Sequence, residues 1–156
     1  MKQLLFALCT ATISIALTGC SEDCCGDVFV TVGISVINED SVDLLDPSEP
    51  SAYIEEDIKI FYLINGMVEE VYFSNLDSPK NFIIGKGSPF YTMDLVPNRD
   101  GSTTYIQWSD SDTDTLVCEF DTGTNRARLT SARFNGELKY QYSFGLEDQR
   151  FFTVVK

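Results

Sequence analysis

The sequence predicts an all-β protein, an antiparallel two-sheet sandwich of the immunoglobulin-like type, with a closed antiparallel β-barrel as the alternative. Three observations favour this class. Apolar and polar residues alternate at a period of two in many short runs, as in half-buried strands. Two pairs, Asn65-Gly66 and Asn135-Gly136, stand between apolar runs and favour the tight turns of β-hairpins. After residue 27 no stretch shows the 3.6-residue period of a long helix.

The first nineteen residues differ from the rest and predict a signal-peptide helix. Lys2 precedes an apolar run from Leu4 to Ala16, and small residues follow that run. We therefore expect a signal peptide over 1–19, an acidic tether over 20–27 and one sandwich domain over 28–156. A domain of this size can hold one hydrophobic core. No second apolar run is long enough for a transmembrane helix.

The end of the signal, Leu17-Thr18-Gly19-Cys20, resembles the lipobox of bacterial lipoproteins. The resemblance implies cleavage before Cys20 and attachment of a diacylglycerol to this cysteine, usually with an amide-linked acyl chain such as palmitate. Two or more acyl chains are enough for stable anchoring. The protein would then be tied to a membrane by lipid at Cys20 and would not span it.

Further short motifs resemble those of small uncharacterised surface lipoproteins of the Bacteroidota group. The acidic tract from Ser21 to Asp27 is similar to their surface-export signals. The sequence also shares their loop from Asp43 to Pro47, the strand end from Tyr62 to Gly66, and the late stretch from Arg133 to Gly136. These resemblances imply a β-sandwich that is anchored to the outer membrane and exposed at the cell surface. They supply no catalytic residues.

The strands are expected in the following order. Residues 28–37 alternate as one strand, and residues 38–50 form a loop rich in acids, Ser and Pro. Asn65-Gly66 joins two strands into a hairpin, and Asn135-Gly136 joins two more. The expected strands after the first loop are 58–64, 68–73, 82–84, 90–95, 103–108, 115–120, 129–134, 138–142 and 151–155. Trp108 and the aromatic residues near it are expected in the core.

The charge of the chain excludes some partners. The net charge is −13, which opposes binding to nucleic acid and to anionic lipid. The acids are concentrated early, because the stretch from Cys20 to Ile58 contains no Lys or Arg. This part is either a solvated tether with its loops or a segment that like-charge repulsion holds away from a negative surface.

The absence of histidine limits the chemistry that the chain can perform. The composition excludes Ser-His-Asp and Cys-His catalysis and zinc sites that use histidine. No glycine-rich phosphate loop is present. We expect a binding or adhesion module that is not an enzyme, with a glycan, a polysaccharide or another envelope protein as its partner. The alternative is a structural or accessory subunit of a cell-envelope complex.

The cysteines leave their pairing open. Cys9 is removed with the signal and Cys20 carries lipid, so Cys24, Cys25 and Cys118 remain. A disulfide from Cys24 or Cys25 to Cys118 would suit an exported protein. The alternative is that Cys118 is a small apolar residue of the core.

Two clusters suggest ligand binding. Asp110, Asp112 and Asp114 alternate in an expected turn and are a candidate calcium site, although Thr115 and Asp121 replace residues that an EF-hand needs. The acid-rich loop from Asn38 to Asp46 is a second candidate of the same kind. In both loops the alternative is a solvated turn. An aromatic row, Tyr140, Tyr142 and Phe144, could stack on sugars or a partner if it is exposed, or pack in the core.

Overall fold

The computed structural model describes residues 28–100, 103–123, 126–144 and 150–156. The expected signal-peptide helix (1–19) and the tether (20–27), including Cys20, Cys24 and Cys25, lie outside these residues. Every regular element in the described part of the chain is a β-strand. None of the described residues belongs to a helix with the length and apolarity needed to cross a lipid bilayer.

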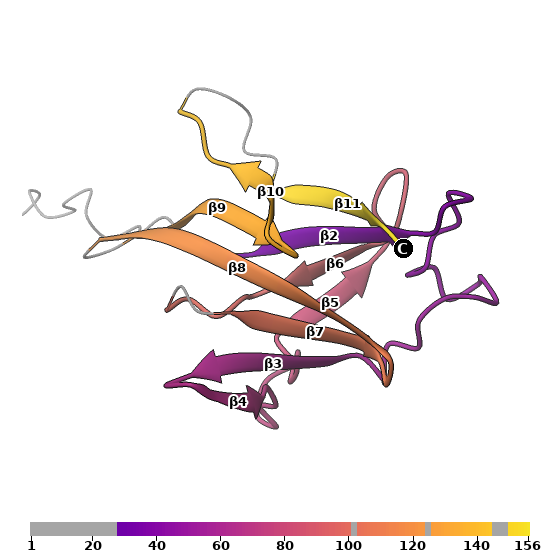
Figure 1. The fold of residues 1–156 in the computed structure, drawn as a ribbon, viewed down its shortest axis with the longest axis horizontal. Coiled ribbons are helices and arrows are strands. Elements are labelled where there is room, and N and C mark those ends of the chain that lie inside the picture. The colour runs from indigo at the N-terminus through magenta and orange to yellow at the C-terminus, as the bar shows by residue number, and fades with distance from the viewer. Residues whose placement is uncertain (1–27, 101–102, 124–125, 145–149) are drawn as a thin grey trace, which may run out of the picture.

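The larger of the two sheets has seven strands. Six follow the order β1-β9-β8-β7-β3-β4, and β10 pairs with the later part of β9. Figure 1 shows β10, β9, β8, β7, β3 and β4 of this sheet. All its pairings are antiparallel except that of β1 with β9. Its strands are β1 (Val28–Phe29), β3 (Lys59–Ile64), β4 (Met67–Glu70), β7 (Thr104–Ser109), β8 (Asp112–Gly123), β9 (Arg126–Phe134) and β10 (Glu137–Gln141).

The smaller sheet has four strands in the order β11-β2-β6-β5. They are β2 (Val32–Ile37), β5 (Phe82–Gly85), β6 (Thr92–Leu95) and β11 (Phe151–Val155). The predicted two-sheet sandwich is therefore confirmed, because the described strands form two separate sheets and not one closed barrel. Most strand pairs are antiparallel, as predicted, but both sheets are mixed because β1–β9 and β2–β11 are parallel. Both parallel pairs join strands far apart in sequence, so neither needs a tight turn.

The strand expected over residues 28–37 is divided between the two sheets. Val28 and Phe29 pair with β9, whereas Val32 to Ile37 pair with β6 and β11. The alternating pattern gave no sign of this division, because both pieces keep the same period of two. The crossing ties the two sheets together at the start of the described chain.

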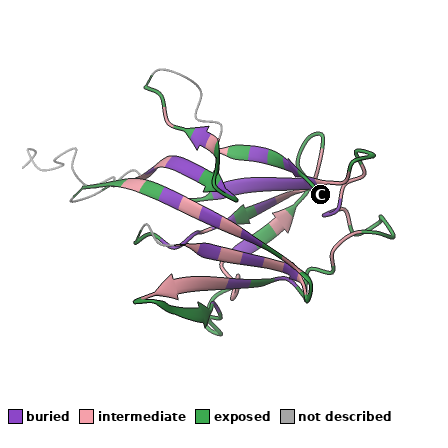
Figure 2. Cartoon of the chain, viewed as in Figure 1, coloured by how far each residue is buried: buried purple, intermediate pink, exposed green. Residues whose placement is uncertain are grey.

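The core lies between the two sheets (Figure 2). Burial alternates along β7 and along the first half of β8, so each strand sends every second side chain inward. Trp108 is fully buried in this core, as expected. The other large, fully buried side chains include Ile34, Ile58, Ile60, Met93, Leu95, Ile106, Leu116 and Leu129.

The sandwich has two distinct ends. At one end β1 pairs with Ala127 and Arg128 of β9, which pair in turn with Thr122 and Asp121 of β8. At the other end lie the β7–β8 turn and the loop from residue 38 to residue 57 (Figure 1). From Asp112 to Asp121 a strand advances about 30 Å at its usual rise per residue. The described chain thus begins at one end, and its longest loop lies at the other.

Candidate functional site

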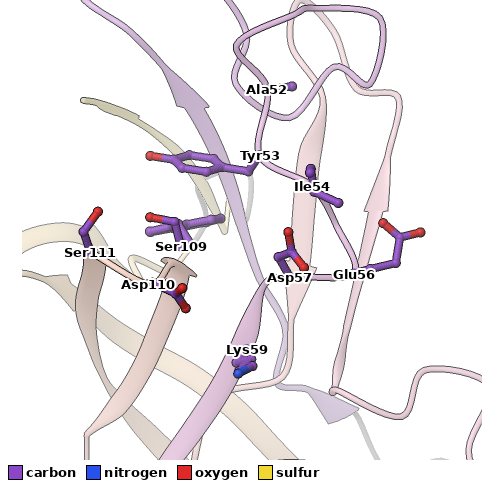
Figure 3. A pocket seen from close by; sticks show the side chains of 10 residues that line it. Ala52, Tyr53, Ile54, Glu56, Asp57, Lys59, Ser109, Asp110 and Ser111 are labelled. Carbon is purple, nitrogen blue, oxygen red and sulfur yellow. The ribbon is translucent and has the colours of Figure 1, made fainter.

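The loop end of the sandwich contains a hollow of about 530 Å³. The β7–β8 hairpin forms one wall, and the segment from Ala52 to Asp57 forms the opposite wall (Figure 3). We call this space the hairpin hollow. It is lined by Ala52, Tyr53, Ile54, Glu56, Asp57, Lys59, Trp108, Ser109, Asp110 and Ser111. Its volume lies within the range of small-molecule sites, and its lining combines aromatic rings with carboxylate, hydroxyl and ammonium groups.

The loop that supplies Tyr53 is fixed to the sandwich by its own buried residues. Leu44 and Leu45 pack in the core. The backbone N–H of Leu44 donates to the Val36 carbonyl over 2.8 Å, and that of Tyr53 donates to the Leu44 carbonyl over 2.9 Å. The loop therefore carries a short ladder that continues from β2, and it holds Tyr53 in a defined place.

The acid-rich loop from Asn38 to Asp46 uses its side-chain oxygens on its own backbone. Asn38 Oδ1 accepts from the N–H groups of Asp40 and Val42, at 3.0 and 2.8 Å. Asp43 accepts from Leu45 N–H through Oδ1 and from Tyr91 N–H through Oδ2, at 2.9 and 2.6 Å. The Ser48 N–H and hydroxyl both donate to Asp46. These oxygens stabilise turns, which favours the turn interpretation of this loop over calcium binding.

Tyr53 is held from two sides. Its ring stacks on Trp108 with centroids 5.4 Å apart and an interplanar angle of 27°. Its hydroxyl donates a 2.6 Å hydrogen bond to Asp112 Oδ2. Burial raises the pKa of the Tyr53 phenol, and the hydrogen bond to Asp112 and the nearby negative charges raise it further. Tyr53 therefore remains a neutral donor and presents a fixed ring to the hairpin hollow.

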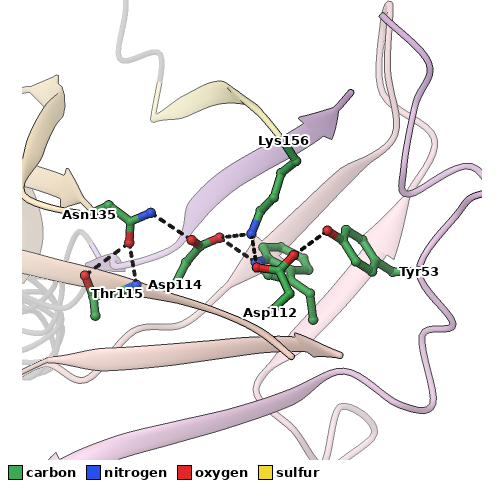
Figure 4. A network of polar contacts seen from close by, with 7 residues as sticks. Tyr53, Asp112, Asp114, Thr115, Asn135 and Lys156 are labelled. Carbon is green, nitrogen blue, oxygen red and sulfur yellow. Dashed lines mark hydrogen bonds and ion pairs between the residues drawn. The ribbon is translucent and has the colours of Figure 1, made fainter. Parts of the chain in front are cut away.

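Asp112 and Asp114 belong to a polar network centred on Lys156 (Figure 4). The Lys156 ammonium lies 2.6 Å from Asp112 Oδ1 and 2.5 Å from Asp114 Oδ2. The Trp108 indole N–H donates to Asp114 Oδ2 over 2.7 Å, and Asn135 Nδ2 donates to Asp114 Oδ1 over 2.7 Å. The network runs without a break from the β9–β10 turn to Tyr53 at the hollow.

The protonation of Asp112 reflects two opposing effects. Its partial burial alone would raise the pKa of this carboxyl. The hydrogen bonds from Lys156 and Tyr53, together with the charge of Lys156, outweigh burial, so the pKa of Asp112 is lowered from its ordinary value. Asp112 is therefore ionised at neutral pH and keeps its contacts to both neighbours.

The three aspartates of the candidate calcium site are not brought together. Only Asp110 and Ser111 form the turn, while Asp112 and Asp114 already belong to β8 and point toward the core side. Asp114 is only 6% exposed and therefore does not belong to a solvated turn. The Lys156 ammonium lies between Asp112 and Asp114, and Asp110 lines the hairpin hollow instead. Among the described residues no group of three acids, histidines or cysteines is placed to hold a metal ion.

Cys118 lies inside β8 with no exposed surface, and it has no disulfide partner among the described residues. Burial raises the pKa of the thiol to about 12, so it stays protonated and packs as a small apolar group. This favours the core interpretation of Cys118. Its disulfide to Cys24 or Cys25 stays a prediction, because both of those cysteines lie outside the described residues.

The aromatic row near the end of the chain is divided by burial. Tyr140 belongs to the core. The Tyr142 hydroxyl accepts a 2.6 Å hydrogen bond from Arg128 Nη1, and the Arg128 guanidinium lies 4.9 Å from the Tyr142 ring centroid. Phe144 is 93% exposed. The three rings therefore do not form one binding face.

No known protein-family model matches this chain, and neither the curated proteins nor the solved structures contain a match to it.

The sequence singles out a residue on one wall of the hollow but none on the opposite wall. The sequence predicts Asp110 as a candidate calcium ligand in an expected turn, and the structure places it in the lining of the hollow. Tyr53 and Lys156 were missed, although Tyr53 is the only aromatic residue in the long acidic stretch between residues 38 and 57. An isolated aromatic residue among acids is the signal that could have identified it. Lys156 gave no local signal, since its partners are more than forty residues away in the sequence.

Proposed function

We propose that this protein is a lipid-anchored, extracytoplasmic binding module that holds its ligand in the hairpin hollow. Lipid on Cys20 would anchor it to the outer membrane, on the cell surface. The observation that carries the proposal is the placement of the hollow. The described chain begins at β1, at the opposite end of the sandwich from the hollow. A domain tethered through residues 20–27 would therefore present the hollow away from the membrane.

The lining of the hollow favours a neutral glycan as the ligand. The Tyr53 ring offers an apolar surface to the face of a sugar ring. Carboxylates of Glu56, Asp57 and Asp110 can accept hydrogen bonds from sugar hydroxyls. Lys59 is the one base in the lining, and the whole chain carries a net charge of −13. Repulsion by these charges disfavours an anionic ligand.

A glycan array tests the ligand class. The probe is the mature chain with Cys20→Ala, which leaves it without its lipid, and the array carries neutral and uronic-acid oligosaccharides. We expect binding to neutral spots only. Ser111→Trp places a bulky ring in the hollow and should abolish this binding. Thr113→Trp is the matched control, because Thr113 lies on the same hairpin, is exposed and does not line the hollow.

Two results would count against this assignment. The first is an array on which the protein binds no neutral glycan. The second is equal binding by the Ser111→Trp and Thr113→Trp variants, which would place the ligand elsewhere on the molecule. Thermal unfolding of both variants checks that neither substitution disturbs the fold.

The anchor has its own test. Cys20→Ala removes the sulfur to which the lipid would be attached, so the full chain with this substitution should leave the membrane fraction. Cys24→Ala, four residues later, should remain with the membranes and serves as the control. Fractionation followed by detection of the protein measures both. Unchanged membrane association of Cys20→Ala would refute the lipid anchor.

A second candidate, an accessory subunit that assembles by strand addition, is favoured by one edge of the smaller sheet. Among the described strands β5 pairs only with β6, and its four residues, Phe82 to Gly85, carry no charge. Uncharged edge strands can pair with a strand of another chain. Replacing Ile83 by Lys should then reduce recovery of a partner in a pull-down from envelope extract. Recovery equal to that of the unaltered protein would oppose this candidate.

A further inference from the structure

A second hollow adjoins the first and shares its wall. It has a volume of about 430 Å³ and is reached across the segment from Ala52 to Glu56. We call it the proline hollow. Ala52, Tyr53, Ile54 and Glu56 line both hollows. The remaining lining residues of the proline hollow are Leu45, Pro47, Glu49, Pro50, Glu55, Ile84 and Tyr91.

Both hollows combine polar and apolar groups. In the hairpin hollow, the groups that can bind hydroxyls include Ser109, Ser111 and Asp110, and they stand beside the rings of Tyr53 and Trp108. The proline hollow combines the apolar surface of Pro47, Pro50 and Ile84 with the Tyr91 ring and with three glutamates, Glu49, Glu55 and Glu56. The ridge between them carries Ile54, which is 61% exposed. Two pockets of mixed polar and apolar lining, separated by an exposed apolar side chain, therefore follow one another along the loop end of the sandwich.

Side-chain hydrogen bonds fix lining residues of each hollow, so both spaces are formed before any ligand binds. On the side of the hairpin hollow, the Tyr53 hydroxyl is fixed to Asp112 over 2.6 Å. On the side of the proline hollow, Asp43 accepts the N–H groups of Leu45 and Tyr91, at 2.9 and 2.6 Å. A preformed site binds more tightly because little order has to be created on binding.

We infer that the ligand is an oligosaccharide chain whose neighbouring units occupy the hairpin hollow and the proline hollow together. This inference rests on the proposed function. One sugar unit fills only one of two adjoining spaces, whereas a chain brings its second unit to the proline hollow at high effective concentration once the first is bound. The exposed Ile54 then lies under the linkage between the two units.

The experiment measures affinity as a function of chain length. Neutral glucose and mannose oligomers, from monosaccharide to hexasaccharide, are titrated by calorimetry into the mature chain with Cys20→Ala. The affinity should rise by about tenfold when the chain becomes long enough to reach the second hollow, because one added ring contact is worth about that factor. The affinity should level off for longer chains.

Two variants separate the hollows. Pro47→Trp fills the proline hollow from an exposed position, so it should lower the affinity for long oligomers to that of short ones and leave short oligomers unaffected. Ser111→Trp fills the hairpin hollow and should weaken binding at every length. Thr113→Trp is again the control, and thermal unfolding reports on the fold of each variant.

The possible outcomes distinguish this inference from the proposed function. Affinity that does not change with chain length, or a Pro47→Trp variant that binds every length as the unaltered protein does, overturns the inference and leaves the single-hollow function standing. Binding of no glucose or mannose oligomer at any length overturns the inference, and it overturns the proposed function as well if the array of neutral glycans also shows no binding. An accompanying set of neutral peptides of matched length checks the ligand class, since binding to peptides alone also overturns both.

Discussion

The two Asn-Gly hairpins have almost the same turn but very different surroundings. Asn65 and Gly66 have φ angles of 52° and 82°, and Asn135 and Gly136 have φ angles of 50° and 82°. The first hairpin joins β3 to β4, and all four residues of β4 are exposed. The second joins β9 to β10 and lies against β8. The turn geometry is thus set by the dipeptide, whereas the packing is set by the strand alongside.

The Asn135 side chain forms hydrogen bonds with the neighbouring strand β8, whereas the Asn65 side chain forms none with a described residue. Asn135 Oδ1 accepts the Thr115 N–H over 2.9 Å, and Asn135 Nδ2 donates to Asp114 Oδ1 over 2.7 Å. The β3–β7 pairing ends at Tyr62 and Thr104, before the Asn65 turn is reached. No described residue forms a hydrogen bond with the side chain of Asn65. The same residue type is therefore a link between strands in one hairpin and only a turn residue in the other.

The two hairpins should differ most in the free energy of unfolding that is lost when the residue before each turn is replaced by alanine. Phe134 is 4% exposed and packs edge-to-face on Phe152, with centroids 5.8 Å apart. Phe134→Ala should lower the free energy of unfolding by about 4 kcal/mol, because it leaves a cavity in the core. Ile64 is only half-buried, so Ile64→Ala should cost about 1 kcal/mol. Urea unfolding measures both, and equal losses would contradict the comparison.

The fold could be predicted where local sequence decides the structure. Both Asn-Gly turns were predicted because φ > 0 at their two central residues is a local demand. The break between β1 and β2 could not be predicted, because it depends on which sheet each piece joins. The same holds for the parallel pairs: β2 meets β11 at Phe151–Gly33, and the two residues are more than a hundred positions apart.

The candidate site was predictable only in part, for the same reason. Asp110 has the properties of an exposed turn residue, and the structure places it in a turn. Asp112 and Asp114 have the same spacing and the same chemistry in the sequence, yet they bind Lys156. The difference arises from Lys156 at the end of β11 and from Tyr53, which no pattern near Asp112 reveals. A charged residue whose partner is distant in sequence cannot be assigned from local spacing.

Replacing Lys156 should cause the second largest loss of unfolding free energy. Lys156→Met leaves Asp112 and Asp114 close together without their shared cation, and breaking a buried ion pair in this way costs about 3 kcal/mol. The control is Lys139→Met on β10, where Lys139 lies 2.8 Å from Glu137 and that glutamate is well exposed. Lys139→Met should therefore lower the free energy of unfolding by less than about 1 kcal/mol. Similar losses in thermal or urea unfolding for the two variants would show that the Lys156 network does not stabilise the fold.

Replacing each turn asparagine by glycine isolates the hydrogen bonds, because glycine also accepts φ > 0. Asn135→Gly removes the contacts to Thr115 and Asp114 and should cost about 2 kcal/mol. Asn65→Gly should change the free energy of unfolding by less than about 0.5 kcal/mol. Denaturant midpoints of the two variants test the contrast. If Asn65→Gly destabilised the protein as much as Asn135→Gly, the contacts of Asn135 would not explain its effect.

The smallest expected effect depends on pH. The lowered pKa of Asp112 means that its contribution to stability is complete above the carboxyl's ordinary pKa and disappears as the pH falls through the lowered value in the folded state. Tyr53→Phe removes one hydrogen bond that lowers this pKa. Tyr53→Phe should therefore lower the free energy of unfolding by about 1 kcal/mol at neutral pH and by progressively less below about pH 4.

Tyr62→Phe is the matched control in the first hairpin, because the Tyr62 hydroxyl donates to the Val96 carbonyl, which does not titrate. Tyr62→Phe should therefore lower the free energy of unfolding by the same amount at every pH. If urea unfolding shows that the loss caused by Tyr53→Phe is also independent of pH in acid, the Tyr53 hydroxyl does not contribute to the lowered pKa of Asp112.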